Sequence, residues 1–215
     1  MSGSGFVSKS TFLTRDASEV VSISQNRSEK IARWVSDYFS PPVMAAATLL
    51  MVAIFAGTSV IWGSISVFLL VGIGFPTLYV FWLVKKKKVS DFHIPIRSQR
   101  IRPMVFMLVT TVISLFLLIG LHTPRFVMIL SLAAFGQLII IFVITLKWKI
   151  SGHAAAVSTF SALCWLFYGS LAGFVFILIP IVIWARLRLK RHTPMQTLAG
   201  TVLGLLTLVA IIFIL

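Results

Sequence analysis

Residues 150–185, ISGHAAAVSTFSALCWLFYGSLAGFVFILIPIVIWA, decide the fold because they contain no Lys, Arg, Asp or Glu. As a single α-helix this stretch would be about 54 Å long, which far exceeds the hydrocarbon core of a bilayer, about 30 Å thick. Two apolar helices joined by a turn near Gly169 to Gly173 fit that thickness. The stretch therefore predicts a hairpin of two membrane-spanning helices.

The rest of the chain also alternates long uncharged stretches with short basic ones. No charged residue lies between Asp37 and Lys85, which leaves room for two spans with a turn at Gly57 to Gly63. Further spans are predicted at Pro103 to Leu121, Phe126 to Leu146 and Pro194 to Leu215. The sequence thus predicts an all-α, polytopic transmembrane helical bundle of about six to seven spans over residues 43–215.

The composition excludes several classes of protein. Hydrophobic residues make up 59% of the chain and charged residues 11%, which excludes a water-soluble enzyme and a disordered chain. The single cysteine, Cys164, excludes a disulfide scaffold. A net charge of +14 would elsewhere suggest nucleic acid, but these basic residues flank apolar spans. We therefore expect membrane lipids, and no nucleic acid, as partners.

The positions of the basic residues orient the predicted spans. Of the 19 Lys and Arg residues, 18 lie in segments 1–42, 85–102, 147–153 and 186–193, and the exception is Arg125. Seven spans place these four segments on one side of the membrane. Because Lys and Arg are retained on the cytoplasmic side, we expect the N-terminus and these loops to be cytoplasmic. The run Lys85 to Lys88 is read as a membrane anchor that contacts lipid headgroups.

The first 42 residues are predicted to be a cytoplasmic tail that contains an amphipathic helix at 27–39. One face of this helix is apolar, at the spacing i, i+3, i+4, i+7 and i+8. Its residues are Ile31, Trp34, Val35, Tyr38 and Phe39. Trp and Tyr suit the headgroup layer, so the helix is expected to lie on the membrane surface and to end before Pro41 and Pro42. Alternatively, it covers a neighbouring subunit or domain; the sequence leaves the oligomeric state open.

Three cytoplasmic segments end at a predicted helix start that carries basic or imidazole groups. The N-terminus of a helix attracts anions through its free N–H groups and the positive end of its dipole. One Arg side chain can donate two parallel hydrogen bonds to phosphoryl oxygens. Three such starts brought together would form a phosphate site. The first start is Pro103, after Arg97, Arg100 and Arg102; the second follows Lys149, with Ser151, Gly152 and His153; the third is Pro194, after Arg186, Arg188, Lys190, Arg191 and His192.

These residues resemble the motifs of the type 2 phosphatidic acid phosphatase superfamily. Ser151-Gly152-His153 looks like its second motif, and Arg186 with His192 looks like its third. Arg102-Pro103 looks like the end of the first. The resemblance covers roughly residues 85–210 and implies metal-independent, cofactor-free hydrolysis of lipid phosphates or isoprenyl diphosphates.

The resemblance also implies a role for each matched residue. His192 would attack phosphorus and form a phosphohistidine, and His153 would protonate the leaving lipid oxygen. Arg102, Ser151, Gly152 and Arg186 would hold the phosphoryl oxygens.

Four positions depart from the family pattern: Pro95, Ile150, Ala185 and Gln196 stand where the family has Lys, Pro, Ser and an acidic residue. The side-chain oxygen of Gln196 could still accept the N–H of the His192 imidazole, which keeps Gln196 among the catalytic candidates. Arg97 or Arg100 could replace the missing lysine, and His93 with Asp91 could assist the site.

The sequence therefore predicts an integral membrane phosphatase that acts on a lipid phosphate or prenyl diphosphate at the cytoplasmic face. A catalytically impaired lipid-phosphate-binding or scaffold protein is the alternative, suggested by Pro95 and Gln196. A transporter or channel subunit is disfavoured because no predicted span contains a charged residue. Gln137, Gly200 and Gly204 are expected to serve helix packing. His122 and Arg125 lie on the opposite side and are given no chemistry.

Overall fold

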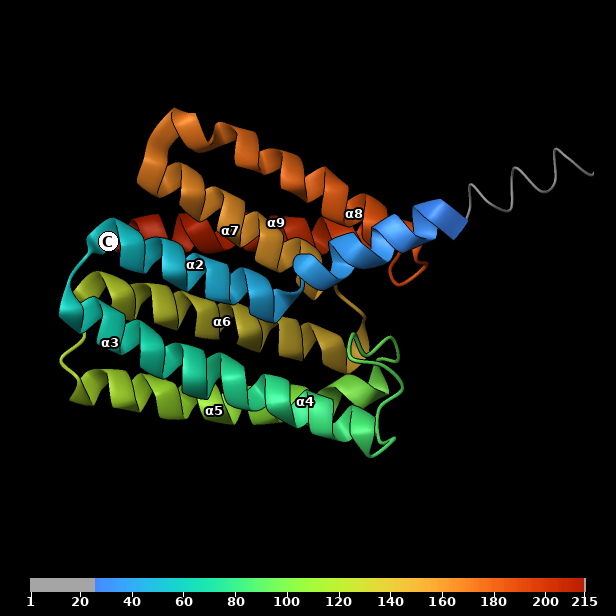
Figure 1. Ribbon diagram of the computed structural model, residues 1–215, viewed down its shortest axis with the longest axis horizontal. Coiled ribbons are helices and arrows are strands. Elements are labelled where there is room, and N and C mark those ends of the chain that lie inside the picture. The colour runs from blue at the N-terminus through green and yellow to red at the C-terminus, as the bar shows by residue number, and fades with distance from the viewer. Residues whose placement is uncertain (1–25, 215) are drawn as a thin grey trace, which may run out of the picture.

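The computed structural model describes residues 26–214, which form a helical bundle without strands (Figure 1). A helix over Asn26–Tyr38 precedes the bundle. The bundle contains α2 (Pro41–Ala56), α3 (Ser59–Val67), the π-helix η1 (Phe68–Gly74), α4 (Phe75–Lys85), the 3₁₀ turn η2 (Ser98–Arg100), α5 (Ile101–Gly120), α6 (Arg125–Lys147), α7 (Gly152–Tyr168), the 3₁₀ segment η3 (Gly169–Ile177), α8 (Leu178–Arg188) and α9 (Pro194–Ile214).

The predicted all-α polytopic bundle is confirmed. Among the described residues, five continuous helical stretches are long and apolar enough to cross a membrane, and the helix Asn26–Tyr38 qualifies together with α2, from which it is bent by 48°. Successive long segments alternate in direction (Figure 1). The chain is therefore a multi-pass membrane protein.

The predicted hairpin is present at residues 152–188. Helical structure is uninterrupted along the 37 residues Gly152–Arg188. The chain nevertheless folds back after Tyr168, because Gly169 adopts φ 66° and α7 contacts both η3 and α8. A positive φ is accessible to glycine at little steric cost, so the turn forms where the sequence places it. The two arms return His153 and Arg186 to the same end of the bundle.

Two predicted boundaries were wrong. The first turn occupies only Gly57 and Thr58, because Gly57 closes α2 in the left-handed conformation and α3 begins at Ser59. The helix α5 begins at Ile101, so Pro103 is its third residue rather than its first. Proline is tolerated there because the first N–H groups of a helix have no partner within it. Arg102 consequently lies inside the first turn of α5.

The helices α7 and α9 pack closely through two glycines, as predicted. A Cβ atom on Gly200 would overlap the carbonyl oxygen of Ser151, and one on Gly204 would overlap that of Ala155. Gln137 on α6 donates a hydrogen bond of 2.9 Å to Thr159 Oγ1 on α7, which confirms its role in helix packing. These contacts hold the start of α7 against the start of α9.

The predicted N-terminal amphipathic helix is present and lies across one end of the bundle (Figure 1). It contacts the bundle through the buried residues Ala32 and Ser36. Its aromatic side chains Trp34 and Tyr38 are 64% and 60% exposed, which leaves most of the predicted apolar face uncovered. Residues 1–25 of the predicted tail lie outside the described residues.

Candidate active site

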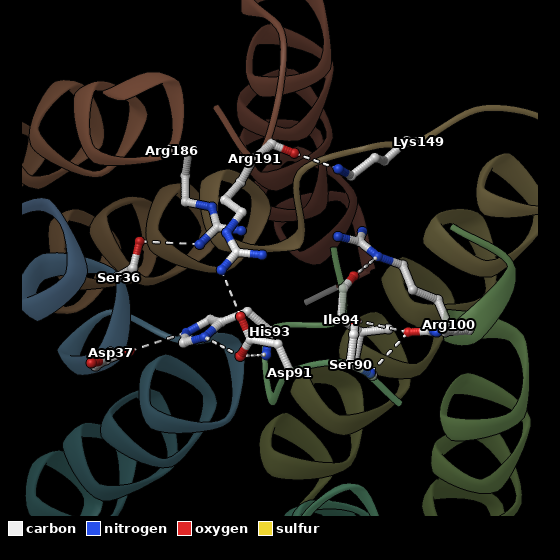
Figure 2. Close-up of polar contacts among 11 residues, drawn as sticks. Ser36, Asp37, Ser90, Asp91, His93, Ile94, Arg100, Lys149, Arg186 and Arg191 are labelled. Carbon is white, nitrogen blue, oxygen red and sulfur yellow. Dashed lines mark hydrogen bonds and ion pairs between the residues drawn. The ribbon is translucent and has the colours of Figure 1, made fainter. Parts of the chain in front are cut away.

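Four segments that are distant in sequence meet at one end of the bundle. They are the helix Asn26–Tyr38 and the connections 86–97, 148–151 and 189–193 (Figures 1 and 2). The side chains of His153 and His192 line the same cavity there, together with Arg100 and His93. The structure therefore brings the two predicted catalytic histidines to a common site.

His192 is held in one tautomer by Gln196, one turn further along the chain. Its Nδ1 lies 3.1 Å from Gln196 Oε1, and this oxygen also accepts the backbone N–H of Thr193 at 3.2 Å. Since Gln196 Oε1 is an acceptor, the Nδ1 atom must carry the proton, which leaves a lone pair on Nε2. Burial, followed by the positive charges of Arg100 and Arg186, lowers the pKa of His192 to about 3. The ring is therefore neutral near neutral pH, which is the form that a nucleophilic imidazole requires.

His153 is fixed by the N-terminal helix. It is only 6% exposed, and its Nε2 lies 3.2 Å from the backbone carbonyl oxygen of Ser36. Because a carbonyl oxygen can only accept, the Nε2 atom carries the proton. The same Ser36 accepts a hydrogen bond of 3.1 Å from Arg186 through its side-chain oxygen. One serine outside the predicted motifs thus holds two predicted site residues.

Arg186 is the most deeply buried charge at the site. Its side chain is 1% exposed, and two of its three nitrogens, Nε and Nη2, have no hydrogen-bond partner among the described residues. An unpaired buried charge is costly unless an ion of opposite sign joins it. Three further cations surround it, namely Arg100, Lys149 and Arg191. We call these four residues the cation cluster.

The cations of this cluster repel one another. Burial, and then the charges of Arg100, Arg186 and Arg191, lower the pKa of Lys149 to about 8. Its Nζ donates to the backbone carbonyl oxygen of Arg191 (Figure 2). A phosphate bound here would neutralise positive charge that the protein leaves largely uncompensated.

Ser151 and Gly152 form the predicted start of α7. The side chain of Ser151 accepts a hydrogen bond of 3.3 Å from the N–H of Ala154, which makes it the N-cap. Its own N–H donates to the carbonyl oxygen of Gln196 at 3.1 Å. Gly152 lines the cavity, where the missing side chain leaves the backbone accessible. The connection 148–151 is thereby tied to the start of α9.

Two predicted phosphate ligands are not brought to the site. Arg102 is exposed on the first turn of α5 and does not line the cavity. Arg97 is also exposed; it donates to the carbonyl oxygens of Thr145, at 3.3 Å, and Leu146. Lys and Arg bind such unpaired carbonyls at helix ends, so Arg97 closes α6.

Arg100 lies in the cavity wall instead. Its Nε donates to the carbonyl oxygen of Ile94 at 2.8 Å and one terminal nitrogen donates to that of Ile150 at 3.3 Å. Of the two arginines that could replace the family's lysine, the structure brings only Arg100 to the histidines.

His93 and Asp91 add a polar cluster to the site (Figure 2). Nε2 of His93 lies 3.4 Å from Asp37, its Nδ1 lies 3.8 Å from Asp91, and its ring centroid is 5.2 Å from that of His153. Asp91 also pairs with Arg191 at 2.6 Å. Burial raises the pKa of Asp91, but the backbone N–H of His93 and the charge of Arg191 outweigh it, so the pKa lies below its usual value. Asp37 was not singled out from the sequence, where its distance along the chain from Asp91 and His93 hides this contact. Lys149 and Arg191 were named only as basic residues before predicted helix starts.

The low pKa of His192 predicts that acid destabilises the protein. In the unfolded chain His192 is protonated below its ordinary pKa of 6.5, whereas in the folded chain it is protonated only below about pH 3. The free energy of unfolding therefore falls on acidification, by about 1.4 kcal/mol per pH unit for a single such group. We expect the melting temperature in detergent to fall between pH 7 and pH 5, and to fall less in the His192→Asn variant.

The exposed His122, at the opposite end of the bundle and with φ 52°, provides the matched control. The His122→Asn variant should lose as much stability on acidification as the wild type. Equal acid sensitivity of the His192→Asn variant and the wild type would contradict the neutral, buried state of His192.

Comparison with known proteins supports the motif assignment. Residues 135–214 match the family model of the PAP2 superfamily, which confirms the resemblance seen in the sequence. The matched segment contains Ser151, His153, Arg186 and His192, but neither the N-terminal helix nor Arg100. The search of curated proteins and the search of solved structures found no match.

Proposed function

From the match of residues 135–214 to the PAP2 superfamily, whose members are phosphatases, we propose a specific activity for this membrane protein. It hydrolyses a lipid phosphate or isoprenyl diphosphate at the cytoplasmic membrane face, without a metal and through a phosphohistidine. The observation that carries the proposal is the buried Arg186, with two unpartnered nitrogens, near a neutral His192. At such a site the arginine can bind a phosphate group, and the neutral imidazole can react with its phosphorus atom.

In the proposed first step the lone pair on Nε2 of His192 attacks phosphorus. The bond between phosphorus and the leaving oxygen breaks, and His153, which takes up a second proton from solvent when the anionic substrate binds, gives one proton to this oxygen and becomes neutral. Arg100 and Arg186 hold the phosphoryl oxygens as charge spreads over them in the transition state. Gln196 keeps the attacking ring in its tautomer throughout.

In the second step water attacks the phosphohistidine. His153, now neutral, takes a proton from this water, and the bond between phosphorus and Nε2 of His192 breaks. The products are inorganic phosphate and either a lipid alcohol or a lipid monophosphate. Both steps balance without any group from outside the site except water and the proton from solvent.

The test is phosphate release from farnesyl diphosphate and from phosphatidate by purified protein in excess EDTA. We expect release by the wild type and a loss of about 10²- to 10³-fold in kcat/KM for Arg186→Lys, because lysine is a single-point donor without the planar fork of arginine. Arg125→Lys, at the opposite end of the bundle, is the matched control and should retain full activity. Release that requires an added metal would reject the proposed mechanism.

A second candidate function is a lipid-phosphate binder without catalysis. The observation that favours it is the neutral Gln196, which orients His192 but cannot stabilise a positive charge on it. A binder would gain melting temperature from a lipid phosphate and release no phosphate. The same preparation therefore decides between the two functions.

A further inference from the structure

An apolar cavity of about 310 Å³ extends from the two histidines into the bundle. In the view of Figure 1, α2 and α6 lie between the α7–α8 hairpin and the pair formed by α4 and α5. The cavity runs among α2, η1, α4, α5 and α6. We propose that it holds the tail of the substrate, and that the substrate is a phosphate or diphosphate ester with one apolar chain. This inference rests on the proposed function for the position of the phosphate.

The polarity of the cavity changes along its length. At the loop end it is lined by His93, Arg100, His153 and His192. Along α5 the lining continues through Pro103, Met104, Met107 and Thr111, which share one helix face. Eight residues of helix separate Pro103 from Thr111, so the cavity reaches about 12 Å below the site. A ligand with an anionic head and an apolar tail matches this gradient.

The π-helix η1 contributes one wall of the cavity. Its residues Phe68, Gly72 and Ile73 line the space beside α5, against which η1 packs. Short π-helical segments are uncommon and frequently lie at functional sites. At Gly72, a Cβ atom would come within 3.1 Å of the Phe68 ring and 3.2 Å of Ser114 Oγ, so glycine lets this wall pack tightly.

The far end of the cavity adjoins a second, smaller cavity, and we call the residues Phe68, Ala134 and Gln137, which line both, the floor. The second cavity has a volume of about 110 Å³. Gln137 donates to Thr159 at this point, and Thr48, Ser131 and Thr207 line the space beyond. An apolar tail would have to break the bond from Gln137 to Thr159 to pass, so the floor sets the length of the tail.

The volume of the cavity favours a substrate with one chain. An apolar cavity of about 150 Å³ holds one benzene molecule, so about 310 Å³ takes on the order of a dozen carbon atoms. Both acyl chains of a typical membrane phosphatidate exceed this volume, whereas one prenyl or alkyl chain of moderate length fills it. The observed space therefore favours a single-chain ester.

The test measures binding of butylphosphonate and dodecylphosphonate, which cannot be hydrolysed, to protein in nanodiscs of one composition. The variant Ala134→Phe places a ring at the floor of the cavity. Its matched control, Leu132→Phe, lies on the same helix at a side chain that is 51% exposed and outside the cavity. For dodecylphosphonate we expect at least about a tenfold higher Kd in Ala134→Phe, roughly the loss of two methylene contacts.

Butylphosphonate should bind wild type and Ala134→Phe within twofold, and Leu132→Phe should match wild type for both ligands. The variant Ala134→Leu has a smaller side chain and should raise the Kd of dodecylphosphonate by an intermediate factor. Its melting temperature should equal that of the wild type, which shows that the change in binding is not caused by misfolding. Unchanged dodecylphosphonate binding in Ala134→Phe, or no binding of either phosphonate to wild type, would overturn the proposal.

A further comparison addresses the number of chains. Dioleoyl phosphatidate should compete with dodecylphosphonate at least about tenfold less well than lysophosphatidate, because only one chain fits. Equal competition would overturn the single-chain assignment. If no ester releases phosphate but the dependence on tail length is found, the catalytic function fails while the tail site stands.

Discussion

Replacing His192 by alanine is expected to reduce phosphate release from a lipid phosphate by at least about 10⁴-fold, because a covalent step cannot proceed without its nucleophile. The neighbouring cations and Gly152 would remain, so the variant should still bind the substrate. The measurement is single-turnover hydrolysis of ³²P-labelled substrate at saturating protein. Acid-labile label should be found on the wild-type protein and not on the variant.

His122→Ala serves as the control for this experiment, because His122 is exposed in the turn between α5 and α6 and does not line the cavity. It should hydrolyse the substrate at the wild-type rate. Phosphate release by His192→Ala at more than about a tenth of the wild-type rate would exclude His192 as the nucleophile and leave the binding function as the better account.

Replacing Gln196 by glutamate is expected to raise the rate of phosphohistidine formation by about 10²-fold or more. Glutamate has the same length as glutamine, so a carboxylate oxygen can occupy the position 3.1 Å from Nδ1 of His192. It would also stabilise the positive charge that the ring acquires on attacking phosphorus; the reverse exchange in a catalytic triad costs about 10⁴-fold. The rate of labelling in a single turnover measures this step directly.

The same substitution should raise the pKa of His192 from about 3, because a nearby negative charge favours the protonated ring. The acid limb of the pH–rate profile should therefore move to higher pH. Gln196→Asp, which has the shorter side chain, tests whether the carboxylate needs the reach of glutamate. A lower rate in both variants would show that the neutral amide is itself required.

The fold follows from the sequence because charge and apolar length are local properties. The hairpin at 152–188 is predicted by an uncharged stretch too long for one span, together with Gly169, which turns at φ 66°. The close approach of α7 and α9 follows from Gly200 and Gly204. In a membrane these features suffice, because each span must satisfy its backbone within its own helix.

The two histidines of the site were also predictable, since each lies at or next to the start of a helix whose sequence resembles a family motif. His153 follows the N-cap Ser151, and His192 precedes Pro194. Local chemistry at these positions is visible in the sequence, and residues 135–214 match the family model. The contact between Gln196 and His192 was anticipated as well, because the resemblance places an acidic partner of His192 at position 196, where the side-chain oxygen of glutamine can also accept the imidazole N–H.

Which of the three arginines before Pro103 lines the cavity, and the contacts of the N-terminal helix, were not predictable in this way. Arg97, Arg100 and Arg102 lie within six residues of one another, and only the irregular path of the connection 86–97 and the turn η2 directs Arg100 into the cavity. Periodicity does not describe such a connection. Ser36 reaches His153 and Arg186 across 117 and 150 residues, a separation without a local signal.

The contacts of Ser36 also order the events of biosynthesis. Its helix leaves the ribosome about 150 residues before Arg186, a delay of roughly 10 to 30 s at usual translation rates. During this interval α2 to α7 are synthesised, and Ser36 in the N-terminal helix has not yet formed its hydrogen bond with Arg186. The contacts of Ser36 with His153 and Arg186 can thus form only after the hairpin of α7 and α8 has been synthesised.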